Sequence, residues 1–164
     1  MQRIESNCAT GVVRTVELTA AEVAAIPVLT LAQRQDAAWT RIKSERDRRI
    51  QKGAKVGLKW YHTDDRSTVQ HLGNKDTARD QMAGGALASS ALLEPTTLEP
   101  IVWKTMDGTF QPMTCQLAID IVKACKAQEF AHYKAAVAHQ TAMMASLTPE
   151  TYNHLTGWPA IFGT

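Results

Sequence analysis

Residues 49–73 read RIQKGAKVGLKWYHTDDRSTVQHLG, and this stretch predicts three consecutive elements. Gly53 is placed to end a helix, because glycine readily adopts the left-handed conformation that closes helices. A two-residue turn with Gly57 at its first central position suits a type II′ hairpin between two short strands. Thr63 or Asp64 can then cap a second helix that has Asp65 in its first turn. We therefore expect a helix, a hairpin and a helix in that order.

The cluster of His62, Asp64 and Asp65 has two interpretations. As ligands, these side chains would hold a metal ion, but the spacing supplies none of the further converging ligands that metal sites normally have. As structural residues, they mark the end of a strand followed by a helix N-cap, for which aspartate is strongly favoured. We favour the N-cap. His132 and His139 lack the i, i+4 spacing of a metal-binding helix, so we expect them at the surface or at an interface.

Capping signals and apolar spacing predict the helices. Thr19 and Glu22 have the spacing of a capping box, which starts a short helix that stops before Pro27. Thr114 can cap the longest helix, which carries a stripe of mostly small side chains. The expected helices span about residues 20–26, 31–51, 66–82 and 115–147, and a further short helix starts at residues 148–150.

The segment PIVWKTMDGTFQPMT, residues 100–114, predicts a second hairpin with an Asp-Gly turn at 107–108. A two-residue turn there places Trp103 and Phe110 as diagonal neighbours on one face. Trp60 of the first hairpin is a natural packing partner for that face. Four short strands would then form one small antiparallel sheet.

Three segments lack clear periodicity. Residues 84–100 are rich in small residues and proline, so we expect a long flexible loop of the kind that often contacts a partner. The apolar tail GWPAIFGT, residues 157–164, should dock on its own chain or on a neighbour. The first 18 residues suggest a short hairpin or an extended arm around a Thr10-Gly11 turn.

The composition limits the classes of function. A chain of 164 residues fits one domain with arms, and its net charge of +2 is too small for the phosphate neutralisation of nucleic-acid binding. Cys8, Cys115 and Cys125 form no CxxC pair and are expected to stay reduced. No apolar segment approaches the ~18 residues of a membrane span or the core of a signal peptide. No nucleotide-binding, hydrolase or metalloprotease motif is present, so we expect no enzymatic activity, no catalytic residue and no cofactor.

Several features together resemble a family of small tailed-bacteriophage proteins, classed as a domain of unknown function and typically encoded near tail-fibre genes. These features are ERDRRI, GAKVGLKWYHTD, VWKTMDGTFQPMT and the closing GWPAIFG, over roughly residues 41–163. The resemblance implies a non-enzymatic tail protein that associates with the tail fibre or baseplate as a structural or adaptor component. The alternative function that the resemblance implies is a tail-fibre assembly chaperone that is absent from the mature virion. The expected location is the virion tail, after synthesis in the host bacterial cytoplasm.

These expectations combine into one picture. The fold class is α+β, mainly helical, with two short hairpins in a small antiparallel sheet and one long helix in the C-terminal half. Residues 1–40 form an arm with a short helix, and residues 41–164 form the tail-associated domain. The expected partners are tail-fibre or baseplate proteins, and a homo-oligomer stays open. The residues expected in the core or at an interface are Trp39, Ile42, Trp60, Trp103, Phe110, Leu117, Ile121, Trp158 and Phe162.

Overall fold

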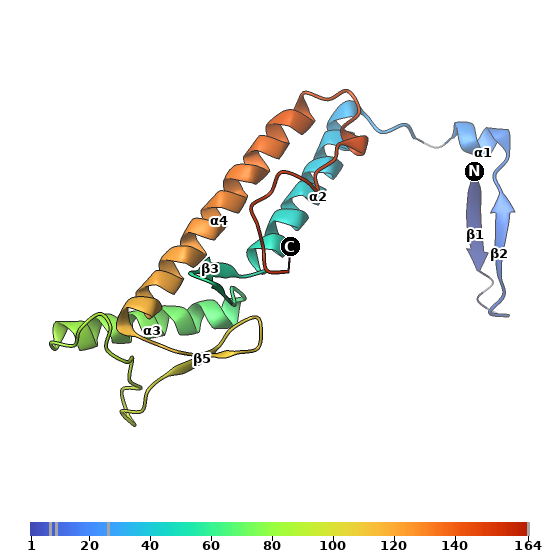
Figure 1. Ribbon diagram of the computed structural model, residues 1–164. Coiled ribbons are helices and arrows are strands. Elements are labelled where there is room, and N and C mark those ends of the chain that lie inside the picture. Colours follow the sequence, from blue (N-terminus) through green and yellow to red (C-terminus); the bar gives the residue numbers. More distant parts are fainter. Residues whose placement is uncertain (7, 9, 26, 164) are drawn as a thin grey trace.

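The computed structural model describes residues 1–6, 8, 10–25 and 27–163 (Figure 1). Its helices are α1 (Ala20–Ala24), α2 (Leu31–Ile50), α3 (Asp65–Ala83), α4 (Cys115–Met144) and the 3-10 turn η1 (Pro149–Thr151). Its strands are β1 (Gln2–Ser6), β2 (Val13–Glu17), β3 (Ala54–Val56), β4 (Lys59–Tyr61), β5 (Val102–Lys104) and β6 (Phe110–Pro112). The α+β class and the long helix in the C-terminal half are confirmed.

The helix starts are fixed by local side-chain caps. Thr19 and Glu22 form the predicted capping box of α1, and Thr30 and Gln33 form a second box at α2. The hydroxyl of Thr114 accepts a hydrogen bond from the N–H of Leu117, 3.1 Å away, as expected for α4. Each cap satisfies a backbone donor that the first helical turn leaves open.

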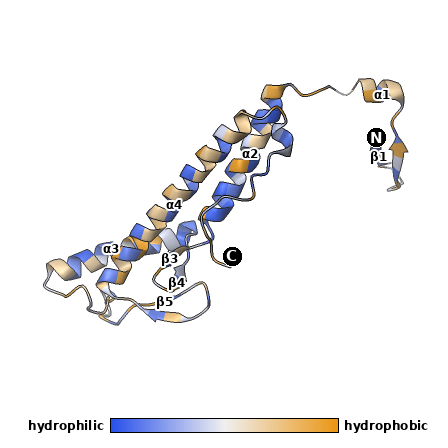
Figure 2. Ribbon diagram, turned by 45° about the horizontal axis from the view of Figure 1, so that its top comes forward, coloured by the Kyte–Doolittle hydropathy of each residue, from blue (hydrophilic) through white to orange (hydrophobic). Residues whose placement is uncertain are grey.

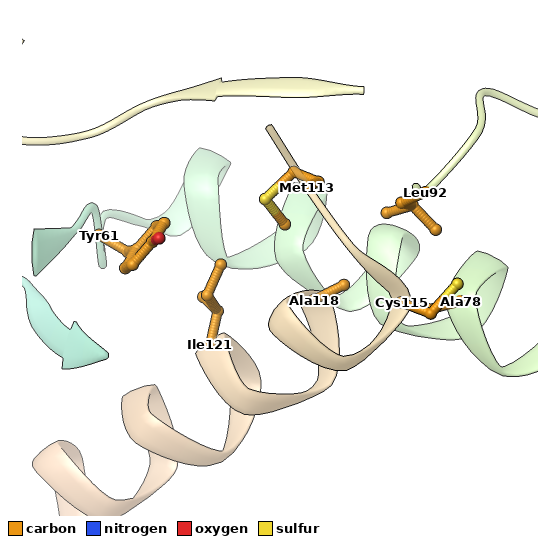
Figure 3. Close-up of a cluster of buried hydrophobic side chains, with 7 residues drawn as sticks. All are labelled: Tyr61, Ala78, Leu92, Met113, Cys115, Ala118 and Ile121. Atoms are coloured by element: carbon orange, nitrogen blue, oxygen red, sulfur yellow. The ribbon is translucent and has the colours of Figure 1, made fainter. Parts of the chain in front are cut away.

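Two apolar clusters hold the helices together along α4. The first lies between α3 and the N-terminal half of α4 (Figure 3), and its buried members are Tyr61, Ala78, Leu92, Met113, Cys115, Ala118 and Ile121. The second lies between α2 and the C-terminal half of α4, and its buried members are Ala38, Ile42, Ala136 and Met143. Each cluster contains a buried alanine from both of its helices, Ala78 and Ala118 in the first and Ala38 and Ala136 in the second, and small side chains let helix axes approach closely.

The first predicted hairpin has the expected turn. Val56 of β3 pairs with Lys59 of β4, which leaves two residues in the turn. Gly57 has a φ of +60°, as the first central residue of a type II′ turn requires. Gly53 closes the preceding helix region with a φ of +94°, and a Cβ there would collide with Sδ of Met106.

The second hairpin has a different register from the predicted one. Lys104 pairs with Phe110, whereas a two-residue turn would have opposed Thr105 to Phe110. The side chain of Asp107 accepts hydrogen bonds from the Thr105 hydroxyl at 2.6 Å and from the Thr109 N–H at 3.1 Å, which stabilises a wider turn. A one-residue shift in pairing moves a side chain to the other face of the hairpin. Phe110 is therefore 69% exposed, and our expectation that it belongs to the core is wrong.

The strands form three separate two-stranded sheets, so the single sheet expected from β3 to β6 is not formed. The two hairpins still touch, because the N–H of Met106 donates to the carbonyl of Trp60 at 3.0 Å. Lys59 also forms an ion pair with Asp107, with Nζ and Oδ2 2.8 Å apart. Trp60 packs edge-on against Phe162 of the tail at 6.4 Å between ring centroids, instead of against the second hairpin.

The irregular segment 84–100 is attached to the rest of the fold at several residues: the carbonyls of Ala88 and Ser90 accept hydrogen bonds from the N–H groups of Gln116 and Cys115 at 2.9 and 3.1 Å. Leu92 is fully buried, its N–H donates to the carbonyl of Met113, and its own carbonyl accepts from Ile101. The amide side chain of Gln81 also donates to the carbonyl of Leu93 at 2.9 Å. The segment is therefore a loop, as predicted, and residues 88–93 in its middle are held against the fold. Its flexibility stays a prediction.

The N-terminal arm stands away from α2, α3 and α4 (Figure 1). β1 and β2 pair antiparallel, and α1 follows directly. An extended connection that includes residues 27–30 then leads to α2. The predicted hairpin is therefore present, and Gly11 in the connection between its strands has a φ of +69°. Residues 7 and 9 of that connection lie outside the described residues.

Candidate interaction surface

The cluster of His62, Asp64 and Asp65 is a helix start. Asp64 is the N-cap of α3, and its carboxylate accepts from the Ser67 N–H at 3.0 Å and from the Ser67 hydroxyl at 2.7 Å. These hydrogen bonds lower the pKa of the Asp64 carboxyl. Within the described part of the chain, no three histidine, cysteine or acidic side chains gather as metal ligands would. The N-cap interpretation is confirmed.

A small cleft of about 100 Å³ lies between α3 and α4, and His71 and Cys125 are among its lining residues. His71 is buried, with Nε2 3.1 Å from the carbonyl oxygen of His62 and its ring against Trp103. Burial lowers the pKa of His71 and raises the pKa of the Cys125 thiol to about 11. A protonated thiol is a poor nucleophile at neutral pH, so this cleft does not have the properties of a cysteine active site.

The C-terminal segment, residues 148–162, packs along one face of the α2–α4 pair. On α2, Arg34 forms an ion pair with Glu150 at 2.9 Å, and Arg41 donates to the Glu150 carbonyl at 2.9 Å. Arg49 donates to the Leu155 carbonyl at 3.3 Å. On α4, Gln128 donates to a carbonyl near the end of the segment. The prediction that the tail docks is confirmed, and the contact is with its own chain.

Two histidines of α4 lie beneath this segment and contact its aromatic side chains. His139 lies 2.9 Å from the hydroxyl of Tyr152 through Nδ1, and its ring is 4.7 Å from Trp158. His132 is fully buried, and its ring is 6.1 Å from Trp158. Our expectation that His132 and His139 lie at the surface or at an interface is therefore wrong, because both are buried within the chain itself. The sequence could not show this, because the segment that covers them follows about 20 residues later.

The opposite face of the same helix pair is open. Lys43 follows the segment-binding Arg41 by two positions, which is about 200° around a helix. Val137 likewise precedes the segment-binding His139 by two positions. This spacing places Lys43 and Val137 on the side of the helix pair opposite the C-terminal segment. On that same side, the guanidinium of Arg46 on α2 lies 4.5 Å from the ring centroid of Tyr133 on α4.

This open face is mainly apolar on α4. Its exposed members are Phe130 (71%), Tyr133 (44%), Val137 (58%) and Met144 (51%). From α2, half-buried Trp39 joins them, with the ammonium of Lys43 5.8 Å from its ring centroid. Hydrophobic residues recur along α4 up to its C-terminal end (Figure 2). We call these residues and Arg46 the open face.

The residues predicted for the core or an interface are distributed over several sites. Ile42 and Ile121 are fully buried, and Trp103 and Leu117 are half-buried against the first cluster. Trp39 and Trp158 pack on the second cluster, and Trp60 and Phe162 pack on each other. Sequence reasoning missed the open face, although the repeat of Phe130, Val137 and Met144 at seven-residue intervals is a signal that could have found it.

The described residues thus define a small α+β protein built on a helix pair with one covered and one open face. Residues 33–155 match the family described as a domain of unknown function, DUF4376, and the chain belongs to that family. No curated protein and no solved structure matches the chain. No described helix is long and apolar enough to cross a membrane.

Proposed function

We propose that this chain is a non-enzymatic adaptor of a bacteriophage tail, which binds a tail-fibre or baseplate protein through the open face. The observation that carries the proposal is the row of exposed apolar side chains on α4. Four large apolar side chains within 15 residues lie on one side of the same helix, exposed by 44–71%, and such a concentration of exposed apolar side chains marks protein contacts. The resemblance to proteins encoded near tail-fibre genes supplies the identity of the partner.

The charges around the open face indicate the chemistry of its partner. Lys43 and Arg46 line the α2 side, and Lys126 stands one helical turn before Phe130 on α4. An apolar strip with cations at its edge fits a partner helix or strand that carries apolar residues flanked by acidic ones. A partner of that kind would bury the aromatic side chains, which dominate the energetics of such contacts.

The ionisable side chains that could act in catalysis are engaged in structural hydrogen bonds, which supports a binding role over a catalytic one. Asp64 is bound to the start of α3, and Asp107 is bound within its turn and to Lys59. The Cys125 thiol has a raised pKa. A catalytic site needs such groups converging on open space, with a pKa suited to proton transfer or attack.

The first test is to measure the amount of this chain, relative to the tail-fibre protein, in purified phage particles and in the lysate from which they came. A fixed ratio in the particles supports a structural component. Depletion from particles, with fibre misassembly when the gene is deleted, would instead identify an assembly chaperone. Normal tails without the gene, and no association with tail proteins in the lysate, would contradict both roles.

The second test addresses the open face with matched variants. Val137→Asp places a charge on the open face, and Val69→Asp places one on α3, where valine is similarly exposed. We expect Val137→Asp to reduce copurification of tail-fibre or baseplate proteins at least tenfold, with Val69→Asp close to wild type. Equal recovery with both variants would show that the open face is not the binding surface.

A further inference from the structure

The N-terminal arm lacks a core of its own. No residue of β1, β2 or α1 is buried, and Ile4 and Val13 are 75% and 64% exposed. A single two-stranded hairpin is marginally stable in water, and this one, with α1, stands away from α2, α3 and α4 (Figure 1). Pairing with another strand would therefore add the stability that the arm lacks alone.

The hydrogen-bond pattern shows which residues could accept a new strand on the β1 side. The N–H of Leu18 donates to the carbonyl of Met1 at 3.0 Å. Hydrogen-bonded pairs alternate along an antiparallel ladder, so the next ones are Arg3 with Val16 and Glu5 with Arg14. The N–H and C=O of Ile4 consequently face away from β2, on the edge where the sheet ends.

We propose that this edge of β1 pairs antiparallel with β1 of a second copy of the chain, centred on Ile4. In that register Ile4 opposes Ile4 of the other copy and exchanges both backbone hydrogen bonds with it. Arg3 opposes Glu5 of the other copy, and Glu5 opposes its Arg3. The two hairpins then form one four-stranded sheet with a twofold axis, which closes the pairing at two chains.

The charge pattern favours this register. Within one chain, Glu5 is bound by Arg14 at 2.7 Å and by Arg3 at 2.8 Å. In the dimer each Glu5 lies between Arg14 of its own chain and Arg3 of the other, and opposite charges across strands stabilise a sheet. On the other face, the two Ile4 side chains become neighbours and shield each other from water.

The edge of β2 does not have this property. Pairing two copies antiparallel around Thr15, whose backbone faces outward on that side, opposes Arg14 to Val16 and Val13 to Glu17. Neither combination pairs opposite charges or two large apolar side chains. The self-pairing edge is therefore β1, and the prediction is specific to one side of the hairpin.

The first experiment uses a proline scan of the two edges on the full-length chain, with any purification tag at the C-terminus. Ile4→Pro removes an outward N–H and leaves the β1–β2 ladder intact, and Thr15→Pro does the same on the β2 edge. By sedimentation equilibrium, we expect a monomer–dimer equilibrium for wild type. Ile4→Pro should raise the dissociation constant about 30-fold, because two symmetric hydrogen bonds are lost. Thr15→Pro should dimerise like wild type.

The second experiment traps the register by a disulfide. Directly opposed residues of a hydrogen-bonded pair have Cα atoms about 5.5 Å apart, which is within disulfide reach. In a Cys8→Ser background, Ile4→Cys should form a covalent dimer on mild oxidation, and Thr15→Cys should stay monomeric. A monomeric wild type, equal effects of both prolines, or equal cross-linking from both cysteines would each overturn the proposal.

Discussion

The imidazole ring of His71 lies against the indole ring of Trp103, with ring centroids 4.3 Å apart and the ring planes inclined by 40°. This contact joins α3 to the second hairpin, and the half-buried Trp103 also packs against the first apolar cluster. The two residues lie 32 positions apart in the sequence, and nothing in the local pattern around either residue pairs them. The contact exists because the register of β5 and β6 turns Trp103 inward and Phe110 outward.

Trp103→Ala should therefore destabilise the protein strongly, whereas Phe110→Ala should not. We expect a loss of about 3 kcal/mol for Trp103→Ala, at the low end of the range for large aromatic residues because the ring is half-buried. Phe110→Ala, in the same hairpin, should cost under about 0.5 kcal/mol. Urea unfolding followed by circular dichroism measures both. Similar losses for the two variants would contradict the observed register.

The buried histidines predict that stability falls in mild acid. Burial lowers the pKa of His71, His132 and His139, and the nearby Arg49 lowers it further for His132. Below about pH 6.5 the unfolded chain binds protons that the folded chain resists, so the free energy of unfolding decreases as the pH falls. The stability that comes from keeping these rings neutral and buried is fully present above the unfolded histidine pKa and is lost as the pH falls below it.

Two measurements check this pH dependence. Urea unfolding between pH 7.5 and 5.5 should show the midpoint moving to lower urea as the pH falls. Imidazole proton shifts in NMR should show three rings that titrate below the ordinary histidine value. A midpoint that is independent of pH, or rings that all titrate normally, would mean that these side chains are hydrated.

Glu45 should contribute more than other charged residues of α2. Its side chain is 9% exposed and is bound by Arg48 at 2.7 Å and Arg49 at 2.6 Å, and these hydrogen bonds lower its pKa to about 2. Glu45→Gln should cost about 1–2 kcal/mol, since Arg48 is half-exposed and screened by water. Asp47→Asn, an exposed neighbour, is the control and should be near neutral. Thermal melts at pH 7 compare the two.

The low pKa of Glu45 also sets the pH range of its contribution. A depressed carboxyl stabilises the fold above its unfolded pKa of about 4.5, and this stabilisation is lost as the pH falls toward about 2. The difference in stability between wild type and Glu45→Gln should therefore shrink over that range. A constant difference down to pH 2 would show that the carboxylate is not the group responsible.

Asp64→Ala should weaken the start of α3 without any effect on metal content. Loss of an N-cap typically costs about 0.5–2 kcal/mol. Asp65→Ala removes only a favourable charge from the first turn and should cost less. Elemental analysis of purified wild-type protein should find no stoichiometric metal. Bound metal that Asp64→Ala abolishes would restore the ligand interpretation.

Local signals in the sequence predicted the ends of the elements well. The caps at Thr19, Asp64 and Thr114, and the turn at Gly57, depend on atoms within a few residues of each other, so their chemistry is visible in a short stretch. The predicted register of the second hairpin was wrong because the Asp107 side chain forms hydrogen bonds across its turn and to Lys59, 48 positions earlier. A dipeptide rule contains no information on such a contact.

The sequence by itself determined the α+β class, the order of the helices and the apolar tail, because capping, turn chemistry and periodicity are properties of neighbouring residues. Tertiary structure alone decided which sides of those elements are covered. His132 and His139 became core residues because residues 148–162 fold back over them. Val137, two positions from His139, remains in solvent on the open face. Burial depends on which distant segment packs on a helix, and that choice is made by the whole chain.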